Sequence, residues 1–183
     1  MIRSRRLLSN QVFGMLVFVT TEVMFFVALI SSFLVIRGDA SRFIIPDGLK
    51  LPVAMTAYNT IALLLSGICL FLASYKTKDY LSSESKPYYW WAVVLGLFFV
   101  LVQGYEWFQL LSFGLSMRSN IFGALFFLLI GSHAFHAICG ILFLSLLFLA
   151  KRGQIFKEDL KAAQIFWFFV VGIWPVLYGL VYF

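Results

Sequence analysis

The sequence predicts an all-α polytopic membrane protein, a bundle of five transmembrane helices. First, 62% of the 183 residues are hydrophobic and only 12% are charged, with a mean hydropathy of +0.96. A soluble domain has about a quarter of its residues charged. Second, the apolar residues gather in five runs, each long enough for the roughly 20 residues that a membrane-spanning helix needs. We expect a single transmembrane domain over residues 1–183, because the intervening loops are too short to hold a second one.

The first two spans are separated by a clear polar interval. We expect the first helix over approximately residues 11–36, followed by the segment RGDASRFIIPDGLK. The second covers approximately 52–75 and is followed by KTKDYLSSESKP. Both intervals combine charge with proline, glycine or serine, which is typical of loops between helices.

Three further spans complete the chain. We expect helices at approximately 88–113, 120–149 and 162–183. Pro87 suits a helix start, because the first turn needs no amide donor, whereas Pro175 falls inside the last span and should kink it or be accommodated by its neighbours.

The charges predict the orientation in the membrane. Cytoplasmic loops are enriched in lysine and arginine. One side of the predicted bundle carries ten of the 14 basic residues, at the N-terminus and in the second and fourth loops. The N-terminus is therefore expected in the cytoplasm and the C-terminus outside. Because these basic residues lie scattered in short loops beside apolar spans, they do not indicate nucleic-acid binding.

Few ionisable side chains remain at membrane depth, namely Glu22, Glu106, His133 and His136, with Gln103 one turn before Glu106. Burying such groups in hydrocarbon costs at least a few kcal/mol each, so they should face the protein interior and pair. Counting 1.5 Å per residue places Glu22 and the histidines near the midplane and Glu106 closer to the outer surface. We therefore expect one buried polar cluster of Glu22 with His133 or His136, and a second of Gln103 with Glu106.

The two histidines of GSHAFHAICG have competing interpretations. Histidines three residues apart could both reach a metal ion, with Glu22 as a third ligand. The alternative is a hydrogen-bonded pair that ties two helices together, which we favour because intramembrane polar residues normally pair with one another. We therefore predict no metal site. Cys69 and Cys139 lie inside apolar runs without a CxxC pattern and are interpreted as small buried hydrophobic residues.

Four ordered motifs resemble the haem-copper oxidase subunit III family. FGMLVFVTTEVMFFVALISSFLVIR resembles the helix that carries the family's buried glutamate in an SEVMFF-type stretch, and YNTIALLLSG resembles its next helix. LGLFFVLVQGYEW resembles the LxxxFxxxQxxEY segment, and SNIFGALFFLLIGSHAFHAICGILFL resembles SxxFGxxFFxxTGxHGxHVxxG. Order and spacing agree over nearly the whole chain, in the five-helix form of the family.

The resemblance implies a non-catalytic subunit of a respiratory oxidase in the bacterial cytoplasmic membrane. Such a subunit packs against the catalytic subunit I, which holds the haem and copper, stabilises it, supports proton uptake during oxygen reduction and binds phospholipid. No cofactor and no catalytic residue is expected in this chain. The residues carried over by position are the buried carboxyl Glu22, the histidine pair His133 and His136, the QxxE residues Gln103 and Glu106, and the lipid-headgroup candidates Lys151 and Arg152.

The last helix departs from the family pattern. Many members read WHFVDxxW, whereas this chain reads WFFVVGIW, with Phe168 and Val171 at the histidine and aspartate positions. The departure leaves open a first alternative, a subunit III-like accessory protein of a nitric oxide reductase. A second alternative is an independent intramembrane metalloprotein.

Overall fold

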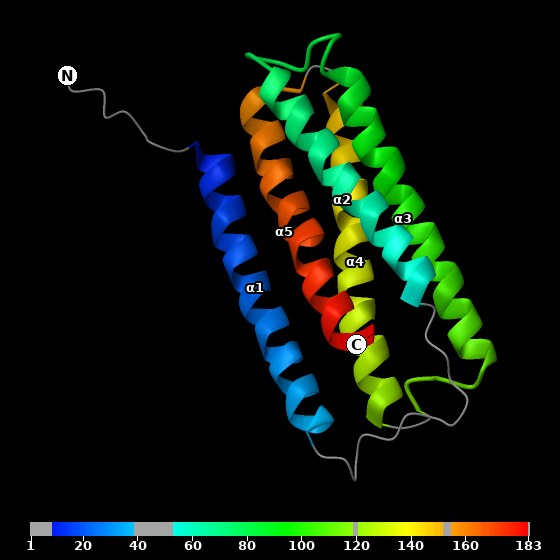
Figure 1. Ribbon diagram of the computed structural model, residues 1–183. Coiled ribbons are helices and arrows are strands. Elements are labelled where there is room, and N and C mark those ends of the chain that lie inside the picture. Colours follow the sequence, from blue (N-terminus) through cyan, green and yellow to red (C-terminus); the bar gives the residue numbers. More distant parts are fainter. Residues whose placement is uncertain (1–8, 39–52, 119–120, 152–154, 183) are drawn as a thin grey trace.

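The computed structural model describes residues 9–38, 53–118, 121–151 and 155–182. Within these ranges it forms five α-helices, each long and apolar enough to cross a membrane (Figure 1). The predicted fold class is confirmed. The helices are α1 (Asn10–Arg37), α2 (Val53–Lys76), α3 (Lys86–Ser112), α4 (Ile121–Ala150) and α5 (Lys157–Tyr182).

The largest difference from the expected helix ends is at α5, which begins at Lys157 and not at residue 162. Its first turn contains Glu158 and Asp159, and acidic side chains are favourable there because they complement the partial positive charge of the helix N-terminus. Because this first turn is charged, a prediction based on hydropathy alone begins the helix after it. At α3, Pro87 lies in the first turn as expected.

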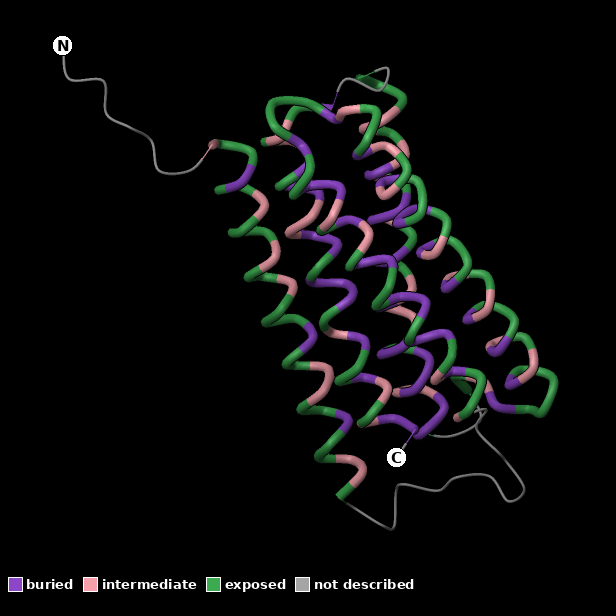
Figure 2. Tube along the Cα trace, turned by 45° about the horizontal axis from the view of Figure 1, so that its top comes forward, coloured by how far each residue is buried: buried purple, intermediate pink, exposed green. Residues whose placement is uncertain are grey.

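Helices α2 to α5 pack together, and α1 lies at the edge of this group. Among the described residues α1 contacts α5 and, less extensively, α4, but neither α2 nor α3 (Figure 1). Only 6% of the most apolar stretch of α1 is buried, against 50% of that of α5, and Figure 2 shows α1 exposed along most of its length. Most of the surface of α1 is therefore apolar and uncovered by the rest of the chain.

The core of α2 to α5 is built around Trp167. Its indole is fully buried, and its Nε1 donates a hydrogen bond to Ser66 Oγ on α2 at 3.0 Å. A Cβ added to Gly96 on α3 or to Gly140 on α4 would lie 2.7 Å from the indole ring. The two glycines therefore let α3 and α4 approach the ring closely, as small residues do in membrane helix packing.

The connection between α2 and α3 is attached to the start of α5. Tyr80 and Phe156 form an isolated antiparallel bridge. The Leu81 amide donates to the Ile155 carbonyl at 2.7 Å, and the Lys157 amide donates to the Asp79 carbonyl at 3.0 Å. These bonds join the ends of α2, α3 and α5 on the side of the bundle where the described chain begins.

Candidate functional site

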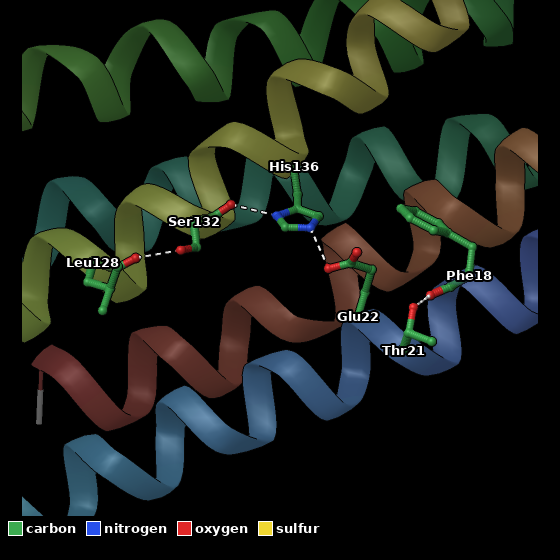
Figure 3. Close-up of polar contacts among 6 residues, drawn as sticks. All are labelled: Phe18, Thr21, Glu22, Leu128, Ser132 and His136. Carbon is green, nitrogen blue, oxygen red and sulfur yellow. Dashed lines mark hydrogen bonds and ion pairs between the residues drawn. The ribbon is translucent and has the colours of Figure 1, made fainter.

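A hydrogen-bonded pair links α1 to α4. Glu22 Oε2 lies 2.8 Å from His136 Nε2, and His136 Nδ1 lies 2.7 Å from the Ser132 carbonyl oxygen (Figure 3). A carbonyl oxygen only accepts, so Nδ1 carries a hydrogen and donates it. The short contact between Nε2 and Oε2 joins the carboxyl group of α1 to the imidazole of α4.

The pair lies at the wall of an open pocket of about 730 Å³ between α1 and α4. The side chains of His136 and Glu22 are 11% and 20% exposed. Phe26, fully buried, lies edge-on to the imidazole at a ring distance of 5.3 Å. The pocket is mainly apolar and aromatic, and its other lining residues are Thr21, Phe25, Trp107, Met117, Phe127, Leu128, Gly131, Ser132 and Phe135.

Of the two histidines expected as possible partners of Glu22, His136 is the one that bonds to it, and His133 does not. A three-residue step turns a helix by about 300°, so the two rings point about 60° apart. His136 therefore faces α1, whereas His133 faces the core. The His133 ring stacks on Trp174 of α5 at 4.8 Å and meets the edge of Phe99 of α3 at 5.9 Å. Neither of its nitrogens has a hydrogen-bond partner among the described residues.

Gln103 and Glu106 lie together on the buried face of α3. Gln103 Nε2 donates to Glu106 Oε2 at 3.1 Å. The Thr56 hydroxyl of α2 also reaches the carboxyl group, at 3.0 Å from Oε2 and 3.1 Å from Oε1. All three side chains are buried. Thr56 is an addition to the Gln103–Glu106 cluster expected from the sequence.

Two other polar residues of α2 were not among the site residues expected from the sequence. The Asn59 amide donates to the Phe99 carbonyl at 3.1 Å, and the Thr60 hydroxyl accepts from Trp174 Nε1 at 2.8 Å. Their signal in the sequence is the recurrence of polar side chains at helical spacing with Thr56, in the stretch TAYNT. In a membrane helix this recurrence indicates a face turned toward other helices.

The lipid-headgroup candidate Lys151 directly follows the end of α4. Lys151 Nζ is 3.4 Å from Asp159 Oδ2 and its side chain is 42% exposed. Its ammonium therefore has a protein partner and still faces outward. Arg152 lies outside the described residues, and a headgroup role for both residues stays a prediction.

The described residues contain no group of three or more histidine, cysteine, aspartate or glutamate side chains placed to hold a metal ion. Cys69 and Cys139 are free thiols in partly buried positions. The polar groups at membrane depth instead contact one another, tryptophan rings or backbone carbonyls.

Comparison with known proteins places these features in a family. The model of the family "Cytochrome c oxidase subunit III" matches residues 8–183. A cytochrome c oxidase subunit 3 of Thermostichus vulcanus is 28% identical over 94% of this chain and 86% of its own length. A probable cytochrome c oxidase subunit 3 of Nocardia farcinica is 27% identical over 93% of this chain and 86% of its own length. That of Drosophila melanogaster is 26% identical over 92% and 67%. This integral membrane protein belongs to the cytochrome c oxidase subunit III family, as its ordered helix motifs predicted.

Proposed function

We propose that this chain is subunit III of a haem-copper terminal oxidase and packs against the catalytic subunit I. The observation that carries the proposal is the family match over residues 8–183, together with relatives of nearly full coverage that are named as cytochrome c oxidase subunits. The complex reduces oxygen and translocates protons. Haem and copper belong to the partner subunit.

The arrangement of polar groups supports a non-catalytic role for this chain. Glu22 and Glu106 are each engaged by hydrogen bonds from neighbouring helices. His136 is engaged through both of its ring nitrogens, and His133 is enclosed by aromatic rings. These contacts fasten α1 to α4 and α2 to α3. The chain thus supplies a stable apolar surface to the complex.

Support of proton uptake is the second part of the proposed role. The Glu22 carboxyl and the His136 imidazole, two groups that can each take up a proton, lie 2.8 Å apart. Because the pair is partly exposed at a pocket wall, it can exchange protons with groups outside the chain. A buried pair closed off by side chains would lack this property.

The proposed setting is the bacterial cytoplasmic membrane, with the N-terminus in the cytoplasm and phospholipid bound to the chain. The positive-inside rule supports the orientation. The largely apolar pocket between α1 and α4 is suited to acyl chains, and the exposed Lys151 ammonium is suited to a lipid phosphate.

Gentle purification of the tagged chain from native membrane tests the proposal. We expect a haem-copper catalytic subunit to co-purify, with the absorbance spectrum of its haems and oxygen-reducing activity. Co-purification with a nitric oxide-reducing partner would instead support the accessory-protein alternative. A lone chain carrying stoichiometric metal would support the metalloprotein alternative.

A further inference from the structure

Several fully enclosed polar atoms have no hydrogen-bond partner among the described residues. Apart from Trp107 Nε1, they are Asn59 Oδ1, Gln103 Oε1, the Tyr182 hydroxyl and both ring nitrogens of His133. The four side chains are between 1% and 7% exposed. Nine-tenths or more of buried polar groups in proteins have a partner, and exceptions commonly mark an ordered water or an ion. Orphaned atoms on four different helices are therefore informative.

These atoms belong to one neighbourhood, which Phe99 helps to define. Asn59 is bonded to the Phe99 carbonyl, and the Phe99 ring touches the His133 ring. Gln103 follows Phe99 by one helical turn, so it lies on the same side of α3.

The neighbourhood extends from Gln103 to the end of α5. Gln103 is bonded to Glu106 at 3.1 Å. The Tyr182 side chain interacts electrostatically with Glu106 and lies beside Thr56 and Gln103. His133, Asn59 and Gln103 are thus grouped around Phe99, and Gln103 is linked onward to Glu106 and Tyr182.

The orphaned atoms are chemically complementary to one another and to water. The amide oxygens of Asn59 and Gln103 accept hydrogen bonds, whereas a neutral His133 ring must donate one and the Tyr182 hydroxyl does both. A water molecule donates two hydrogen bonds and accepts others, and buried waters typically make about three. Water between these groups satisfies acceptors and donors at the same time.

We propose that this part of the bundle binds a chain of buried water molecules, which runs from His133 past Asn59 and Gln103 to Glu106 and Tyr182. Water suits these groups better than a metal cation does. Both the Thr56 hydroxyl and the Gln103 amide nitrogen turn toward Glu106 as donors, whereas a cation site needs oxygen lone pairs directed at its centre. The water chain joins His133 to the Gln103–Glu106 cluster, although the sequence analysis assigned them to two separate clusters.

Hydroxyl-radical footprinting with short X-ray pulses tests the proposal on the intact complex purified with this chain. Radiolysis of a bound water generates radicals in place, and these oxidise the adjacent side chains. The chain offers a matched pair of probes, because Trp174 and Trp167 are both fully buried. Trp174 stacks on His133, whereas Trp167 lies among glycines and Ser66. We expect Trp174 to be oxidised several-fold faster than Trp167, and equal, slow oxidation of both would overturn the proposal.

A Gln103→Met variant provides the second arm, since it removes the orphaned acceptor at nearly constant volume. In complex that assembles normally, we expect Trp174 oxidation to fall to the Trp167 level. Trp174 oxidation that stays at the wild-type rate in the assembled variant contradicts the water chain. So does a strict dependence of the thermal stability on sodium, with choline as the comparison salt, because that result identifies a cation as the occupant. Neither outcome depends on which oxidase the chain serves.

Discussion

At the residue scale, two histidines one turn apart have different environments in this bundle. His136 lies between the Ser132 carbonyl and Glu22 and joins α4 to α1. His133 lies between aromatic rings of α3 and α5. A sequence with a single glutamate near the midplane predicts that an imidazole pairs with it. Which imidazole does so depends on the position of α1 around α4, and that position is a property of the packed bundle.

Glu22→Ala tests whether the pair holds α1 in place. Removing the carboxyl leaves His136 Nε2 without its partner, so we expect a loss of about 2 kcal/mol of stability for this charge-assisted hydrogen bond. Thermal unfolding in detergent measures the loss, and retention of subunit I during purification measures its consequence.

Two variants make the Glu22 experiment interpretable. Glu22→Gln preserves a hydrogen-bonding side chain toward His136 and should lose less stability than Glu22→Ala. Thr20→Ala is the matched control, because Thr20 is exposed on the same helix and, among the described residues, its hydroxyl bonds to the Leu16 carbonyl alone. Wild-type stability and assembly of Glu22→Ala would show that the pair contributes nothing to the attachment of α1.

At the element scale, the sequence predicts where the helices are more directly than it predicts which helices pack against each other. Five apolar runs with polar intervals specify five spans, and Pro87 marks the start of α3. The peripheral position of α1 is not encoded so plainly, because α1 is apolar around most of its surface and only Glu22 was expected to face the protein interior. The polar face of α2 was the available signal for helix contacts, since Thr56, Asn59 and Thr60 all point into the bundle.

Two glycines of the Trp167 core provide an element-scale prediction. A methyl group at Gly96 or Gly140 would lie 2.7 Å from the indole, which forces α3 or α4 away from α5. We expect Gly96→Ala and Gly140→Ala each to cost about 1–3 kcal/mol, the usual penalty for overpacking a core. Thermal unfolding of the purified complex measures it.

Gly104→Ala is the control for both substitutions. Gly104 also lies in α3, but an added Cβ meets no atom within 4 Å there. The same chemical change should therefore leave the stability unchanged or raise it, since alanine favours the helix over glycine. Equal destabilisation by all three variants would mean that the effect comes from the glycine backbone and not from contact with Trp167.

At the scale of the whole molecule, the described residues form a four-helix group joined at one end and a fifth helix attached along its side. The bridge between Tyr80 and Phe156 joins the loops on the side where α1 begins (Figure 1). Most of the basic residues that the structure describes also lie on this side. Composition and charge thus predict membrane insertion and orientation, whereas the lateral arrangement of the helices depends on close packing at particular glycines and aromatic rings.

The orientation can be tested with single cysteines at the two ends of the bundle. Ser83 and Met117 are both exposed in loops, on opposite sides of the predicted membrane. Lysine and arginine are held on the cytoplasmic side during insertion, and the side of Ser83 carries ten of the 14 basic residues. In intact spheroplasts, we expect a membrane-impermeant maleimide to label Met117→Cys directly and Ser83→Cys only after permeabilisation. The unmodified chain, with Cys69 and Cys139 inside membrane spans, is the background control, and the reverse labelling pattern would place the N-terminus outside.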